Sequence, residues 1–107
     1  MIFIVVKFPV RPECVSEWPS LVAEFTAATR AEPGNIFFDW ARSLDDENEF
    51  VLTEAFRDGA AGSEHVSSEH FKAAMSWMPS AISATPKIVN VEVPSDGWSA
   101  MGELSPR

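Results

Sequence analysis

The chain has 107 residues, 46% of them hydrophobic, and carries 16 acidic against 8 basic side chains, a net charge of −8. This length predicts one domain, and the acidic balance excludes the basic stripe with which a protein binds a nucleic-acid backbone. The single cysteine, Cys14, cannot form an internal disulfide, which favours a reducing compartment.

The first expected element is a strand from Ile2 to Pro9, with apolar side chains on both faces. This apolar run is far shorter than the roughly 20 residues that cross a bilayer. It also lacks the basic start and cleavage pattern of a secretory signal. We therefore expect a cytoplasmic protein without a membrane partner.

A helix is expected next, because apolar side chains recur at helical spacing in Val15, Trp18, Val22, Phe25 and Thr29. With Ser16 as the N-cap, Pro19 falls in the first turn, where its missing N–H costs nothing. The helix ends at "EPGN", where Gly34 suits a left-handed C-terminal position.

Two alternating strands, 35–44 and 49–57, flank the polar turn "DDEN" and predict an antiparallel hairpin. Ile36, Phe38 and Trp40 are expected to share one face of the first strand. In the second strand, Leu52, Glu54 and Phe56 share a face.

The next stretch is expected to be helical in two parts, with Asp58 capping the first part and Ser67 or Ser68 the second. The second part has an apolar stripe that includes Phe71, Met75 and Met78, and Pro79 ends or kinks it. The last strand covers 87–93.

The order β-α-β-β-α-β predicts an α+β, ferredoxin-like domain over 1–94, with a four-stranded antiparallel sheet and both helices on one face. The uncovered face would then be apolar, which predicts a homodimer by sheet-to-sheet packing about a two-fold axis. The tail, 95–107, is expected to pack on the partner through Trp98, Met101 and Leu104. The alternatives are that these residues cover the face of their own chain, or that the tail is disordered.

An ordered set of short motifs resembles the antibiotic biosynthesis monooxygenase family. The motifs run from Pro33-Gly34 through Arg42-Ser43, Asp45-Asp46 and "FVLTEAF" to the "HVSSEHF" segment. The resemblance covers about residues 2–93 and implies a dimeric α+β barrel. Members include cofactor-free oxygenases of hydroquinones and anthrone-type polyketides, haem-degrading proteins and an isomerase of a phosphorylated sugar. The haem-degrading branch fits poorly, since Phe56 stands where that branch has a tryptophan.

A cofactor-free oxygenase holds an electron-rich aromatic substrate in an apolar pocket, removes a proton and stabilises the anion while O2 reacts. The base should titrate near neutral pH, which suits His65, or Glu54 if burial raises its pKa. The chain has no tyrosine for such proton chemistry. The residues expected to bind the substrate between sheet and helices are Phe38, Trp40, Leu52, Phe56, His70, Phe71, Met75 and Met78, for which plain core packing is the alternative.

The two histidines of the chain, His65 and His70, could form a pair or have separate roles. Five positions on one continuous helix place side chains roughly 140° apart. A break at Ser67 could bring the two histidines together, but no third ligand is evident, so no metal site is predicted. His70 is expected to pack or cap beside Phe71. Glu54 needs a partner and could orient His65, while Arg42 is expected to pair with Glu54 or Asp39.

The sequence thus favours a cofactor-independent monooxygenase that oxidises a quinol or polyketide-type aromatic substrate with O2. One alternative is a binding or scaffold dimer without catalysis, and another is an isomerase of a small sugar-like metabolite. A walled aromatic cavity at His65 would favour the oxygenase, and a cavity lined by Arg, Lys and Ser the isomerase. A filled core would favour the scaffold.

Overall fold

The computed structural model describes all residues, 1–107, and its four strands form one antiparallel sheet in the order β2-β3-β1-β4. The strands are β1 (Ile2–Pro9), β2 (Asn35–Arg42), β3 (Glu49–Phe56) and β4 (Lys87–Glu92). This confirms the predicted α+β, ferredoxin-like arrangement.

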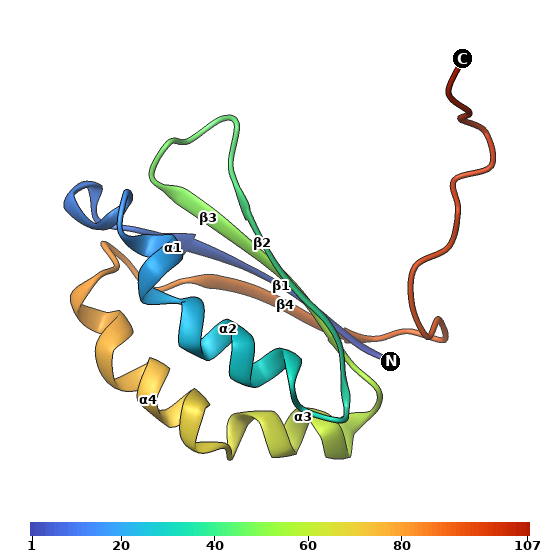
Figure 1. The fold of residues 1–107 in the computed structure, drawn as a ribbon, viewed down its shortest axis with the longest axis horizontal. Helices are drawn as coiled ribbons and strands as arrows, with labels where there is room; N and C mark the ends of the chain where they lie inside the picture. Colours follow the sequence, from blue (N-terminus) through green and yellow to red (C-terminus); the bar gives the residue numbers. More distant parts are fainter.

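All the helices lie on one side of this sheet (Figure 1). They are α1 (Trp18–Leu21), α2 (Ala23–Arg30), α3 (Gly59–Val66) and α4 (Glu69–Trp77), with short 3-10 turns at Pro12–Cys14 and Met78–Ser80. No helix is long and apolar enough to cross a membrane.

The core lies between the helices and the inner face of β1, where Ile4, Val6 and Phe8 are buried. Within the sheet, Ile4 lies between Glu54 of β3 and Asn90 of β4, so that these three residues form one row across the strands. Paired residues of adjacent strands point to the same side of a sheet. The row therefore faces the helices.

The first helical region is nearly as predicted, because its five apolar-stripe residues, Val15 to Thr29, are all buried. Two details were wrong. The helix is divided at Val22 and has no side-chain cap, since Glu17 rather than Ser16 is the N-cap of α1. Pro19 does lie in the first turn.

Gly34 has no positive φ, so the left-handed position predicted for it is wrong. A Cβ added at Gly34 would lie 2.3 Å from the Cβ of Ala61 in α3. The glycine is therefore required by a close approach between two segments, not by backbone conformation.

The prediction that Ile36 shares a face with Phe38 and Trp40 was also wrong. The β2–β3 register shifts between Asn35 and Phe37, a bulge that leaves Ile36 exposed. Phe37 and Phe38 are both buried, on opposite sides of the strand.

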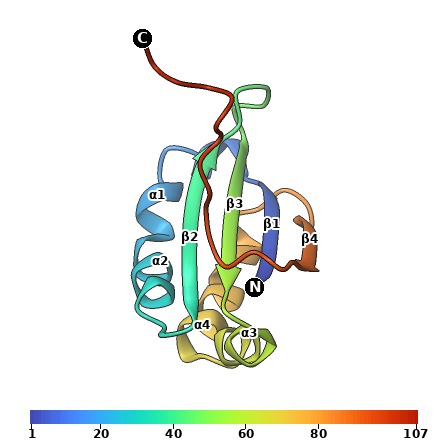
Figure 2. The same ribbon diagram turned by 90° about the vertical axis from the view of Figure 1, so that its right-hand side faces the viewer.

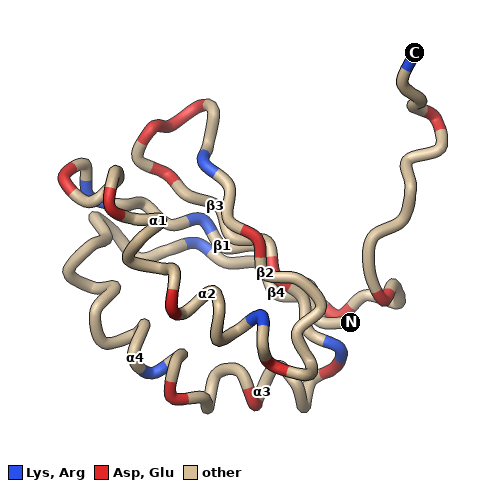
Figure 3. The backbone as a smooth tube through the Cα atoms, viewed as in Figure 1, with Lys and Arg blue, Asp and Glu red and all other residues tan.

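After β4 the chain forms no further helix or strand, and its tail leaves the sheet beyond the end of β4 (Figures 1 and 2). Trp98 contacts Phe37 of its own chain, with ring centroids 5.0 Å apart. Met101 and Leu104 are exposed. Acidic residues are spread over the loops, helices, strands and tail (Figure 3).

Candidate functional site

The break between α3 and α4 brings the two histidines together. Ser68 caps α4 by accepting a hydrogen bond from the Phe71 N–H, and its hydroxyl donates to the His65 carbonyl, 2.6 Å away. The chain thus turns between His65, in the last turn of α3, and His70, in the first turn of α4. This places the rings 6.1 Å apart between centroids.

Both imidazoles meet one carboxylate, that of Glu32 in the loop after α2. Glu32 Oε2 lies 2.8 Å from His65 Nδ1 and 2.5 Å from His70 Nε2. The two histidines were expected to have separate surroundings, and the structure instead gives them a shared partner. The 140° angle of a continuous helix does not apply, because the chain turns between them.

The contact with the Glu32 carboxylate assigns the tautomer of His65. An ionised carboxylate only accepts hydrogen bonds, so the His65 Nδ1–H donates to it. In the neutral ring, Nε2 then carries the lone pair, and this nitrogen lies 3.8 Å from Glu54 Oε1. His65 can accept a proton on the side of Glu54, while Glu32 holds the ring from the other side.

Glu54 is a buried acid in the middle of β3, with 5% of its surface exposed. Burial, followed by the negative charge of Glu32, raises the pKa of Glu54 from 4.5 to about 7. Its carboxyl is thus close to half-protonated at neutral pH, so it can give or take a proton there.

A shell of aromatic rings holds His65, which is 4% exposed. The centroids of Phe56 and Phe71 lie 4.7 and 5.2 Å from that of His65. Phe25 stacks on it at 5.8 Å, and Phe38 lies at 6.2 Å. These contacts restrict rotation of the His65 imidazole.

A cavity of about 290 Å³ opens beside His65 and Glu54, between the sheet and helices α3 and α4. Ten of its fourteen wall residues are hydrophobic, and its polar side chains are Glu54, His65 and Asn90. Of the residues expected to line a substrate pocket, four do so: Leu52, Phe71, Met75 and Met78.

The other expected pocket residues lie elsewhere. Phe38 and Phe56 are fully buried in the core behind His65. His70 borders a different hollow, on the outer side of α2 and α4. Phe38 and Phe56 thus pack in the core, which was the alternative given for them, and Phe56 also borders a separate hollow on the α3 side.

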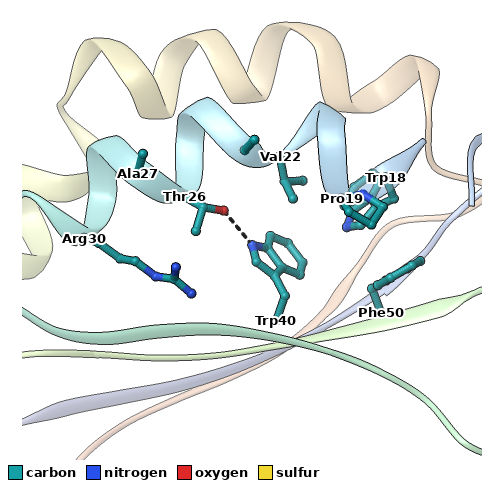
Figure 4. Close-up of a pocket in the computed structure, with 9 residues that line it drawn as sticks. Trp18, Pro19, Val22, Thr26, Ala27, Arg30, Trp40 and Phe50 are labelled. Atoms are coloured by element: carbon teal, nitrogen blue, oxygen red, sulfur yellow. Dashed lines mark hydrogen bonds between the residues drawn. The ribbon is translucent and has the colours of Figure 1, made fainter. Parts of the chain in front are cut away.

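Trp40 lines a second cavity, of about 320 Å³, between α1, α2 and the sheet (Figure 4). Its indole Nε1 donates to the Thr26 hydroxyl, 2.9 Å away. None of the cavity's lining residues is a histidine or a carboxylate. It therefore lacks a group that could exchange protons near neutral pH.

Arg42 does not have the predicted partners. Its guanidinium donates to the Glu47 carbonyl in the hairpin loop, and Asp39 pairs instead with Arg30 at 3.5 Å. Glu54 thus has no cationic side chain beside it except His65 when that ring is protonated.

Glu32, His65 and His70 also have the chemistry of a metal-binding set, with ligand atoms all within 4.8 Å of one another. Two ligands about 2.0–2.1 Å from a tetrahedral zinc ion would lie roughly 3.4 Å apart. The contacts of 2.8 and 2.5 Å have the spacing of hydrogen bonds instead. In this structure the three residues form a hydrogen-bonded cluster, and Glu32 supplies the third group that was not evident from the sequence.

Sequence reasoning missed Glu32, Phe25 and Asn90. Glu32 had one available signal, since an acidic residue just after a helix is unfavourable for the helix dipole and suggests another role. Phe25 was identified only as core. Asn90 lies in a strand with no alternation of burial, so its orientation followed only from the register.

Two sequence comparisons, one with a family model and one with a single relative, agree with each other. The family model described as antibiotic biosynthesis monooxygenase matches residues 1–77. YcnE of Bacillus subtilis (strain 168), which is provisionally named a monooxygenase, is 34% identical over 91 residues. These residues are 85% of this chain and 92% of YcnE.

Solved structures share the fold. Rv0793 from Mycobacterium tuberculosis superposes with a TM-score of 0.80 at 26% identity, covering 92% of this chain and 98% of its own. A Caulobacter crescentus CB15 protein, provisionally named an antibiotic biosynthesis monooxygenase, has a TM-score of 0.83 at 23% identity. That match covers 88% of this chain and 90% of the other.

Proposed function

The chain belongs to the antibiotic biosynthesis monooxygenase family, and we propose that it is a cofactor-independent monooxygenase of a quinol-type aromatic substrate. It would use O2 as the oxidant and work in the reducing cytoplasm that the single cysteine suggests. The observation that carries this proposal is the cavity at which His65 and Glu54 meet a largely apolar wall.

The size of the cavity favours a small ring system. Ligand pockets commonly measure about 300–1,000 Å³, so 290 Å³ suits one or two aromatic rings. Phe25 and Phe71 supply aromatic walls, and Met75 is a deformable side chain at the mouth.

The first step of the proposed reaction is proton removal from a phenolic hydroxyl of a hydroquinone. His65 Nε2 is suited to this step because Glu32 holds the proton on Nδ1 and thereby stabilises the charged ring. An ionised Glu54 would stabilise the positive charge that develops on the His65 imidazole. Its pKa of about 7 allows this ionised form near neutral pH.

The second step joins oxygen to carbon. The substrate anion gives one electron to O2, and recombination at a ring carbon beside the oxygen forms a hydroperoxide. The proton returns to the outer oxygen, the O–O bond breaks, and the ring C–H becomes C=O as water leaves. The substrate thus loses two hydrogen atoms and gains one oxygen atom, and the second oxygen atom leaves as water.

The structure lends less support to the alternative functions. A phosphorylated sugar would need cationic groups, and no Arg or Lys lines this cavity. A scaffold whose core is filled would have no cavity at a buried acid. The oxygenase is therefore the function that the site favours.

Oxygen uptake with a panel of hydroquinones and anthrones tests the proposal. We expect turnover by the wild type, and a loss of at least about 100-fold in His65→Ala, in the range typical of general-base removal. Glu69→Gln changes an exposed carboxylate away from the cavity and serves as the control. Equal turnover by wild type and His65→Ala would reject the role of His65, and no turnover with any substrate would reject the oxygenase.

We further propose that two copies pack sheet against sheet. The outer face carries Phe3 and Val5 of β1 beside Val91 and Val89 of β4, and these two β4 valines are 43% and 64% exposed. An apolar face of this kind favours a protein partner. The tail, with Trp98 75% exposed despite its contact with Phe37, would complete the interface.

Light scattering tests this interface. We expect a dimer for the wild type and a monomer for Val89→Glu, because a charge at the centre of an apolar interface would be buried without a partner. Leu44→Glu, on the fully exposed hairpin loop, is the control and should stay dimeric. A monomeric wild type would refute sheet-to-sheet packing.

A further inference from the structure

The cavity has a polar group at each end of an apolar floor. Glu54, Ile4 and Asn90 form one row across β3, β1 and β4, and all three line the cavity. Neighbouring strands lie about 4.8 Å apart, so the Cα atoms of Glu54 and Asn90 are roughly 9.6 Å apart with Ile4 between them. A ring resting on Ile4 would thus have a carboxyl on one side and an amide on the other.

We propose that Asn90 is the second polar anchor of this cavity and that it selects para-hydroquinones, whose two oxygens lie at opposite ends of the ring. One oxygen would face Glu54 and His65, and the other would bond to the Asn90 amide. The inference rests on the proposed function in one respect, namely that the oxygen at Glu54 and His65 is the one that reacts. The anchor itself is a statement about binding.

The spacing decides between the ring isomers. The two anchors stand on strand positions whose Cα atoms are roughly 9.6 Å apart, so substrate oxygens that bond to both side chains must lie well apart from each other. Adjacent oxygens of a catechol lie only about as far apart as a hydrogen bond, roughly 2.7 Å. Para oxygens, on opposite sides of the ring, are about twice as far apart and can reach both anchors.

The chemistry of an amide suits both the substrate and its product. A hydroquinone oxygen carries a hydrogen that the Asn90 carbonyl can accept, and a quinone oxygen is an acceptor to which the Asn90 NH2 can donate. Asn90 is exposed and lies in the edge strand β4, so a ligand can reach its amide. A purely accepting carboxylate at this position could bind only the reduced form.

The two cavities beside the row support a role for Asn90 near the reacting group. A second hollow, on the α3 side, shares Ile4, His65, Val66 and Asn90 with the main cavity. Asn90 and His65 therefore line both hollows. No other Asn and no Gln lines either cavity.

Calorimetric titration without oxygen tests the inference, with 1,4-dihydroxynaphthalene, 1,2-dihydroxynaphthalene and 1-naphthol as probes. In the wild type we expect the 1,4-diol to bind roughly 5- to 10-fold more tightly than 1-naphthol, the value of one added hydrogen bond. The 1,2-diol should bind like 1-naphthol. In Asn90→Ala the three probes should bind within about 2-fold of one another.

Two further variants sharpen the test. Asn90→Asp should keep its preference for the 1,4-diol but bind 1,4-naphthoquinone more weakly than the wild type, because the donor is lost. Glu92→Ala, an exposed β4 residue outside the cavity, should behave as the wild type.

The outcomes separate this inference from the proposed function. It would be overturned if the wild type did not prefer the 1,4-diol, or if Asn90→Ala kept that preference. Selective binding that depends on Asn90, without oxygen uptake, would support the anchor and reject the oxygenase. Oxygen uptake with unchanged selectivity in Asn90→Ala would reject the anchor alone.

Discussion

Replacement of Glu54 by glutamine should change how the stability of the protein depends on pH. The Glu54 pKa is raised from 4.5 to about 7 in the folded chain, so folding disfavours the ionised form. Between these pH values the unfolded chain releases a proton that the folded chain keeps, and the stability falls as the pH rises. Below pH 4.5 this cost is absent, and above pH 7 it is complete.

The size of the effect follows from the same two values. Each tenfold change in acid dissociation is worth about 1.4 kcal/mol, so the full cost is roughly 3 kcal/mol for a side chain only 5% exposed. Glutamine has nearly the same shape and no charge to bury. We therefore expect Glu54→Gln to be more stable than the wild type above pH 7, by up to about 3 kcal/mol.

Urea unfolding at pH 5 and at pH 8.5 measures this difference. The advantage of Glu54→Gln should grow with pH, while Glu69→Gln, which changes an exposed carboxylate, should follow the wild type at both values. A constant difference between Glu54→Gln and the wild type would show that Glu54 titrates normally. Glu54 could then not exchange protons near neutral pH, as the proposed reaction requires.

Two other changes test the surroundings of the site. Gly34→Ala should destabilise the fold by about 1–3 kcal/mol in urea unfolding, because the new Cβ would lie 2.3 Å from that of Ala61. Gly62→Ala, in a helix with open space around it, should be neutral or stabilise by up to about 1 kcal/mol, and equal effects would refute the close approach. Glu32→Gln should lower the pKa of Glu54 in a carbon NMR titration, because the charge of Glu32 helps to raise it. An unchanged pKa would exclude coupling of the two acids.

The sheet and helices could be predicted because their residues obey local rules. The alternation in β3, the helical stripe from Val15 to Thr29 and the caps at Asp58 and Ser68 each have a local cause, and each is present in the structure. The bulge at Ile36 has no such signal. It depends on how β2 pairs with β3 and not on β2 alone.

The site was only partly predictable, for a related reason. His65 and Glu54 could be identified by their chemistry and by the family resemblance. Glu32 was missed because it lies 33 residues from His65 in the chain, and only the tertiary fold brings the two side chains together. The association of His65 with His70 was missed for the same reason. The two imidazoles are linked through Glu32, which is distant from both in the sequence.

The measurement that tests the central claim most directly is the fate of labelled oxygen. Protein freed of metals with a chelator would be given the hydroquinone of highest turnover under 18O2, and the product analysed by mass spectrometry. We predict one labelled oxygen atom in each product molecule from the wild type, and none above the uncatalysed background from His65→Ala. Unlabelled product, or turnover that requires an added metal, would contradict a cofactor-independent monooxygenase acting through His65.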